Sequence, residues 1–99
     1  MAYIDFSNKS RSDIAVIKSF IAQDNPERAV SYIEEALGKF ISTVGAFPSA
    51  CPKYSRRKNI RRYVSGDYNI YYSYNGNTDI VEVLHIFHSS QLINSLFLD

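Results

Sequence analysis

The sequence predicts a single α+β domain over residues 1–99, in which a helical hairpin packs on a small, largely antiparallel sheet. The expected element order is β-α-α-β-β-β, with an optional helix at the end. Three observations support this fold class. The length of 99 residues suits one domain. Two segments with a helical apolar period come first, and after them the apolar period changes to two. An Asn-Gly step at residues 75–76 is typical of a tight β-hairpin.

The first strand and the first helix are predicted within the opening 26 residues. Apolar residues alternate over Ala2–Phe6, which indicates a short strand. Residues 7–10 supply candidates for a helix N-cap, and Ser10 with Asp13 forms a weak capping box. Isoleucines at positions 14, 17 and 21 then follow at helical spacing. We therefore expect a helix of about fifteen residues that ends at residues 23–26.

A second helix is predicted to begin at once. Asn25 is a good N-cap, and Pro26 suits the first turn because its missing N–H would lack a partner there in any case. Glu27 lies near the positive end of the helix dipole. Apolar residues continue on one stripe as far as Gly45, and Leu37 and Phe40 of this stripe are expected in the core. Because the connection between the helices is so short, we expect them to lie antiparallel as a hairpin.

The second half of the chain is predicted to form three strands. Residues 46–55 contain Pro48 and Pro52 and are expected to be a loop. The strands are Asn59–Ser65, Tyr68–Tyr74 and Thr78–His88, joined by turns at residues 66–67 and 75–77. The last strand is apolar on both faces apart from Glu82 and His85, as expected of a central strand. Four apolar residues in the tail, Leu92, Ile93, Leu96 and Phe97, favour a last helical turn or a segment docked on the core.

Composition excludes several classes of protein. The single cysteine, Cys51, excludes an internal disulfide framework and a cysteine-based zinc cluster, and its Pro-flanked loop offers no catalytic context. No apolar run approaches the roughly 18 residues that a membrane span needs. The amino terminus shows no signal-peptide pattern. We therefore expect a cytoplasmic domain that binds neither a membrane nor a cofactor.

The near-neutral net charge of +1 hides a basic segment. Residues 53–62 carry six of the eleven cations and no acid, whereas the other 89 residues carry five cations and ten acids. Such clustering is unnecessary for solubility and favours contact with an anionic partner over a merely solvated loop.

Several short motifs occur in an order and spacing that resemble those of the RelE/ParE superfamily of bacterial type II toxins. The resemblance extends over about Tyr3–His88. The motifs are Ile4–Ser7, Asp24-Asn25-Pro26 with Ala29, Phe47-Pro48, Ile60-Arg61-Arg62-Tyr63, Tyr68-Asn69-Ile70-Tyr71-Tyr72 and Val83–His88. The resemblance implies a toxin that is neutralised by a cognate antitoxin in a hetero-oligomeric complex. It also implies one of two targets: RelE-type members cut messenger RNA in the ribosomal A site, and ParE-type members poison DNA gyrase.

Two substitutions favour the ParE-like branch. The ribonuclease branch commonly places arginines where this chain has Asn69 and Ser89. A neutral side chain cannot replace arginine in stabilising a scissile phosphate. We therefore expect no enzymatic activity and predict DNA gyrase as the target. If the chain were a nuclease, the resemblance implies that His88, Arg61 and Arg62 would form its site. A third interpretation is an inactive homologue that only binds an antitoxin.

The two histidines receive different interpretations. The resemblance places a histidine at His88, which we interpret as structural rather than as an acid or base. His85 is three residues earlier and should lie on the opposite face of the strand, so a joint metal or acid–base site is not expected. ParE-like chains often have arginine at the positions of His85 and Gln91, and both are missing here. This difference keeps the divergent, inactive homologue open.

The candidate partner-binding residues are basic or aromatic. Loop residues Arg56, Arg57 and Lys58 could face an acidic antitoxin, gyrase or RNA, and the same role is open for Arg61, Arg62, His85 and His88. Arg61 and Arg62 alternate along a strand, so one of them should reach the helix side. The tyrosines at positions 63, 68, 71, 72 and 74 are interpreted as strand-filling side chains rather than as platforms for nucleic-acid bases.

Overall fold

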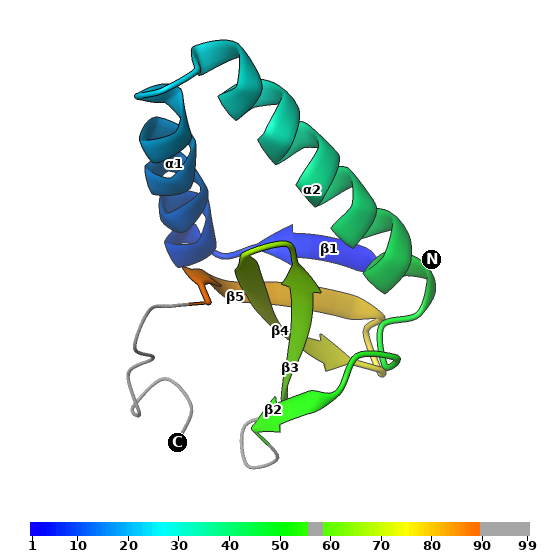
Figure 1. The fold of residues 1–99 in the computed structure, drawn as a ribbon. Helices are drawn as coiled ribbons and strands as arrows, with labels where there is room; N and C mark the ends of the chain where they lie inside the picture. Colours follow the sequence, from blue (N-terminus) through cyan, green and yellow to red (C-terminus); the bar gives the residue numbers. More distant parts are fainter. Residues whose placement is uncertain (56–58, 90–99) are drawn as a thin grey trace.

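The computed structural model describes residues 1–55 and 59–89 and confirms the predicted fold class (Figure 1). The elements are β1 (Tyr3–Phe6), α1 (Asn8–Ala22), α2 (Pro26–Ala46), β2 (Lys53–Ser55), β3 (Ile60–Ser65), β4 (Tyr68–Asn75) and β5 (Ile80–His88). The five strands form one sheet in the order β1-β5-β4-β3-β2. β1 runs parallel to β5, and the other pairs are antiparallel. Both helices lie on the same side of the sheet.

The structure differs from the predicted elements in two places, apart from shifts of a single residue. The expected loop at residues 46–55 contains the short edge strand β2, which pairs with β3 through Lys53 and Arg61. β5 begins at Ile80, two residues later than predicted, because the turn before it is longer. Asp79 closes that turn with φ +56° and accepts a hydrogen bond from the Tyr74 hydroxyl at 2.7 Å. The apolar tail predicted as a last helical turn lies outside the described residues.

Both helices begin at side-chain caps. The Ser7 hydroxyl accepts a hydrogen bond from the Ser10 N–H at 3.1 Å, and the Asn25 carboxamide accepts one from the Arg28 N–H at 3.1 Å. The predicted capping box of Ser10 and Asp13 is wrong, because Ser7 is the cap and the Asp13 carboxylate reaches across to β5. From their short connection the two helices run in opposite directions, as predicted, and they diverge (Figure 1). No helix of the described chain has both the length and the apolar character for crossing a membrane.

The core lies between α2 and the centre of the sheet. Phe40 is completely buried, and its ring meets those of Phe6, Tyr63 and Tyr72 edge to face at 5.3–6.4 Å between centroids. Val81 and Val83 of β5 complete the layer beneath it. Phe40 was predicted to be in the core and is. Leu37, which was also expected there, is only partly buried and lines the groove between the helices and the sheet.

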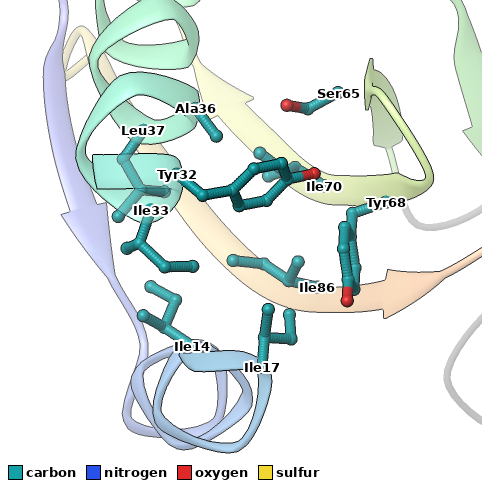
Figure 2. Close-up of a pocket in the computed structure, with 10 residues that line it drawn as sticks. All are labelled: Ile14, Ile17, Tyr32, Ile33, Ala36, Leu37, Ser65, Tyr68, Ile70 and Ile86. Carbon is teal, nitrogen blue, oxygen red and sulfur yellow. The ribbon is translucent and has the colours of Figure 1, made fainter. Parts of the chain in front are cut away.

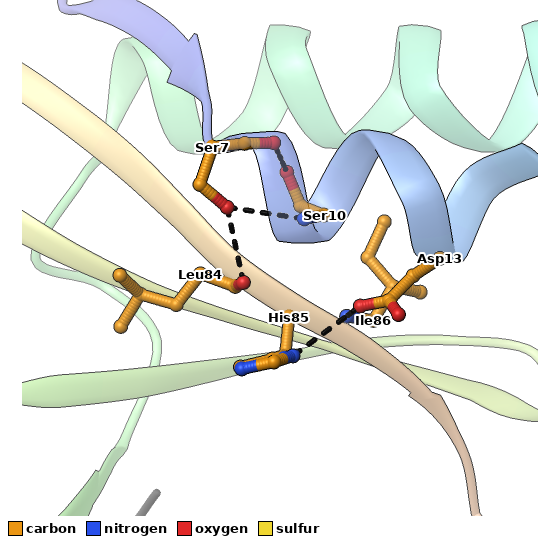
Figure 3. A network of polar contacts seen from close by, with 6 residues as sticks. All are labelled: Ser7, Ser10, Asp13, Leu84, His85 and Ile86. Carbon is orange, nitrogen blue, oxygen red and sulfur yellow. Dashed lines mark hydrogen bonds and ion pairs between the residues drawn. The ribbon is translucent and has the colours of Figure 1, made fainter.

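The carboxyl-terminal half of β5 is completed by α1 rather than by a strand. β1 ends at Phe6, opposite Val83, and leaves the edge of β5 beyond that point without a neighbouring strand. The Ser7 N–H donates to the Val83 carbonyl at 3.1 Å, and the Ser7 hydroxyl donates to the Leu84 carbonyl at 3.1 Å. The Ile86 N–H donates to Asp13 Oδ2 at 3.0 Å (Figure 3). Side chains of the first two turns thus replace the hydrogen bonds that a longer β1 would have made.

These contacts coincide with a β-bulge. Tyr71 pairs with His85, but the next residue of β4, Tyr72, pairs with Val83, so Leu84 is an extra residue in β5. The Leu84 carbonyl accepts the hydrogen bond from the Ser7 hydroxyl. A bulge leaves one residue outside the ladder and exchanges the faces of the residues that follow it. The α1 amino terminus therefore holds β5 where its ladder is interrupted.

We expect Asp13→Ala to lower the free energy of unfolding by about 1–3 kcal/mol, because it leaves the Ile86 N–H of a half-buried strand without an acceptor. Asp13→Asn keeps an oxygen acceptor and should cost less. Urea denaturation measures both, with Ser12→Ala on the exposed side of α1 as the control. A loss below about 0.5 kcal/mol for Asp13→Ala would contradict the role given to this carboxylate.

Candidate functional site

The sheet presents two chemically different faces. On β4, Ile70 and Tyr72 point toward the helices and belong to the core, so Asn69, Tyr71 and Ser73 between them point away. The strand register places further residues beside them on that side. We call this the helix-free face and define it by Asp5, Tyr54, Ile60, Arg62, Val64, Asn69, Tyr71, Ser73, Glu82, His85 and Phe87.

A line of aromatic and basic side chains crosses the helix-free face. The Arg62 guanidinium carbon lies 5.2 Å from the centroid of the Tyr54 ring, in cation–π geometry. The Tyr54 ring in turn meets Tyr71 edge to face at 5.1 Å. On the next strand the His85 ring stacks on Phe87 at 5.0 Å with an interplanar angle of 14°. Of the predicted site residues, this face contains Arg62 and His85.

Asp13 holds His85 from the side. Its Oδ2 lies 3.4 Å from His85 Nδ1, and the two side chains are about one-fifth exposed (21% for Asp13 and 18% for His85). The same oxygen accepts the Ile86 N–H, so the carboxylate is fixed from two directions (Figure 3). A carboxylate in this position limits the orientation of the imidazole ring. Sequence reasoning missed Asp13, because no local pattern links it to a histidine 72 residues away along the chain.

Tyr71 cannot act as a base on this face at neutral pH. Burial raises the pKa of Tyr71, the neighbouring Tyr54 raises it further, and the positive charge of Arg62 opposes the shift only in part. The side chain is completely buried. A phenol that stays protonated can donate a hydrogen bond but cannot accept a proton. The chemistry open to this face is therefore binding.

The three residues implied for a nuclease site do not come together. Arg61 points to the side opposite Arg62, as predicted for alternating strand residues, and its Nη1 donates to the carbonyls of Ser49 (3.0 Å) and Cys51 (2.6 Å). It therefore anchors the loop after α2. His88 lies at the end of β5, where its ring meets Tyr68 edge to face at 5.3 Å. The three side chains thus point to three different parts of the surface.

The predictions for the two histidines are confirmed in their geometry. His85 stacks on Phe87 of the helix-free face, whereas His88 packs on Tyr68, which contacts Tyr32 of α2 on the helix side. They therefore lie on opposite faces. The described residues contain no cluster of three or more histidine, cysteine, aspartate or glutamate side chains that could hold a metal ion.

The tyrosines serve mainly as packing groups. The Tyr72 hydroxyl is buried and donates to the Pro48 carbonyl at 2.9 Å, which ties β4 to the loop after α2. Burial and, less strongly, Cys51 raise the pKa of Tyr72 far above its ordinary value. Burial is also the main cause of the raised pKa of Tyr68. The half-buried Cys51 packs against the core.

An apolar groove opens on the helix side, where α1 and α2 diverge above the sheet (Figure 2). Its lining residues come from both helices and from β3, β4 and β5: Ile14, Ile17, Tyr32, Ile33, Ala36, Leu37, Ser65, Tyr68, Ile70 and Ile86. The enclosed part has a volume of about 30 Å³. Pockets for small metabolites are roughly ten times larger or more. The groove therefore suits the apolar side chains of a protein partner.

The other predicted site residues, Arg56, Arg57, Lys58 and Gln91, lie outside the described residues. Asn69 and Ser89, which stand at positions of arginine in the ribonuclease branch, are both within them. Asn69 lies on the helix-free face, and the Ser89 N–H donates to the Asp67 carbonyl at 2.7 Å to close the end of β5. Neither side chain supplies a cation.

Comparisons with known proteins agree with this arrangement. The sequence model of the ParE toxin family of the type II toxin–antitoxin system parDE matches residues 4–93. A solved structure of the chromosomal ParDE toxin–antitoxin system from P. aeruginosa is similar with a TM-score of 0.71 and 13% identity, covering 89% of this chain and 96% of that chain. The toxin–antitoxin complex RelBE2 from Mycobacterium tuberculosis is similar with a TM-score of 0.60 and 18% identity, covering 91% and 93%. No curated protein matches the sequence.

The raised pKa values of Tyr71 and Tyr72 predict a loss of stability at alkaline pH. An unfolded tyrosine ionises near pH 10, whereas these buried phenols stay protonated in the folded chain. The stabilisation is therefore complete below about pH 10 and is lost above it, at up to about 1.4 kcal/mol per pH unit for each tyrosine. Tyr72→Phe should flatten this dependence, and Tyr3→Phe at an exposed position should not. Urea denaturation between about pH 9 and pH 11 measures the slopes, and equal slopes for Tyr72→Phe and wild type would contradict the assignment.

Proposed function

We propose that this chain, which belongs to the ParE toxin family of type II toxin–antitoxin systems, arrests growth by binding DNA gyrase rather than by cutting RNA. The gyrase target rests on the resemblance of the chain to ParE-type toxins. The proposal describes a toxin that acts through a binding surface, with no bound cofactor and no catalytic centre.

One observation supports binding over catalysis more than any other. Cleavage of RNA through its 2′-hydroxyl needs cations and an acid–base group around one phosphate. Here Arg61 Nη1 donates to the Ser49 and Cys51 carbonyls on one side of β3, while Arg62 lies over Tyr54 on the other. His88 lies at a third place, on the ring of Tyr68. No scissile phosphate could touch all three.

The second candidate remains a RelE-like, ribosome-dependent endoribonuclease. The observation in its favour is that His85, oriented by Asp13, shares a face with Arg62. In the register Arg62 and His85 both pair with Tyr71, one from each side, so Tyr71 stands between them. This arrangement supplies one cation and one acid–base group. An efficient nuclease would need a further cation where Asn69 and Ser89 stand.

We infer that the cognate antitoxin occupies the apolar groove between α1, α2 and the sheet. Antitoxin side chains would contribute affinity through the apolar lining, which includes Ala36 and Leu37 (Figure 2). The basic sequence at residues 56–58 would speed capture of an acidic partner. Such an antitoxin tail would be disordered alone and would fold on binding.

The target assignment predicts a clear difference between two assays. Purified protein should inhibit supercoiling by DNA gyrase, and it should leave messenger RNA intact on translating ribosomes because no phosphate site is assembled. Supercoiling assays and primer extension measure the two activities on the same preparation. A strong pattern of cuts in the ribosomal A site that Arg62→Ala and His85→Ala abolish would favour the nuclease instead.

The groove assignment predicts that Ala36→Glu weakens antitoxin binding at least tenfold, because it places a charged side chain in an apolar groove. Ala15→Glu, the same change at an exposed position of α1, is the matched control and should bind like wild type. Titration calorimetry with the cognate antitoxin measures both dissociation constants, and melting curves check that both variants fold. Equal dissociation constants for the two variants would place the antitoxin elsewhere.

A further inference from the structure

The helix-free face carries two carboxylates whose charges are not neutralised within the described residues. Asp5 of β1 and Glu82 of β5 are register partners, and both side chains are exposed. Like charges directly opposite each other on neighbouring strands destabilise a sheet. Lys9 borders the same hollow as Glu82, but none of the ion pairs between described residues involves either carboxylate. The β1–β5 side of this face is therefore negative.

The β3 side of the same face is positive. Arg62 has no carboxylate partner among the described residues, and its guanidinium instead lies over the ring of Tyr54. An arginine resting on an aromatic ring loses little side-chain freedom when a carboxylate approaches it. Beside it, Val64 is 60% exposed and Tyr54 is 38% exposed. Arginine and aromatic side chains with exposed apolar neighbours are typical of the centre of protein–protein interfaces.

The strand order places the two charged sides on opposite sides of β4. β3 and β5 flank β4, so Arg62, level with Tyr71, and Glu82, level with Ser73, stand on either side of it, about 10 Å apart across the sheet and two residues apart along it. A two-fold axis that runs above β4, inclined to the strands so that it takes up this offset, exchanges the Arg62 side of one copy with the Glu82 side of the other. Under that axis, Arg62 of each copy lies over the Asp5–Glu82 pair of its partner.

We propose that the helix-free face is the interface of a symmetric homodimer, in which Arg62 of each chain pairs with Glu82 and Asp5 of the other. The face is self-complementary, as an isologous contact requires, because it carries one positive and one negative side. The pairing also relieves the repulsion between the two carboxylates. It leaves the apolar groove on the helix side free, so the proposal is independent of the target and the antitoxin.

The test exchanges the charges one at a time. Sedimentation equilibrium of the wild type should give the mass of two chains at micromolar concentration, with dissociation favoured by added salt. Arg62→Glu and Glu82→Arg should each sediment as a single chain, because each places like charges in contact. An equimolar mixture of the two variants should restore the two-chain mass, since both contacts in the mixed dimer are then between opposite charges. Arg28→Glu and Glu34→Arg on exposed positions of α2 are the controls and should remain dimeric, alone and mixed.

The mixture separates this interface from simple misfolding. A restored dimer requires both variants to be folded and identifies the contact as one between residue 62 and residue 82 of different chains. A wild type that sediments as one chain at all concentrations would overturn the proposal. So would single variants that stay dimeric, or a mixture that stays monomeric while circular dichroism shows both variants folded.

Discussion

The edge of β5 beyond Val83 is the constraint on which the rest of this structure depends. A strand whose edge is half buried must place its backbone donors and acceptors on some partner, and β1 is too short to provide one there. Ser7 and Asp13 of α1 supply the missing groups through a hydroxyl and a carboxylate. The amino terminus of α1 is thereby fixed against the sheet, and the direction of the helical hairpin follows from it.

That attachment also determines which side chains share a face. The bulge at Leu84 lies where α1 takes over from β1, and it turns His85 and Phe87 to the helix-free face while Ile86 enters the apolar groove. Arg61 and Arg62, which alternate on β3, are divided between the two faces. The result is a domain with an apolar groove on one side and a charged, aromatic surface on the other. Such a division suits a protein that meets different partners on different sides.

Short-range sequence patterns predicted most of the fold. Most of the features that they did not predict depend on long-range contacts. Local signals predicted the cap at Asn25, the hairpin at residues 75–79 and the strands β3 to β5. The type of each element is correct, although some boundaries differ by one or two residues. The strand β2 was not predicted, because its three residues, Lys53–Ser55, are too few to show a periodic pattern. Asp13 looked like a capping residue, since its true partner, Ile86, is 73 residues away. Leu37 has the spacing of a core residue, but it lines the apolar groove.

Amide hydrogen exchange at Ile86 tests most directly whether the Asp13 carboxylate completes β5. In the wild type this amide should be protected nearly as strongly as those of the central ladder between β4 and β5, because its acceptor is fixed. In Asp13→Ala the protection of Ile86 should fall sharply while that of Val81, which lies in the β1–β5 ladder, stays high. Exchange at Ile86 as fast in the wild type as in Asp13→Ala would contradict the account.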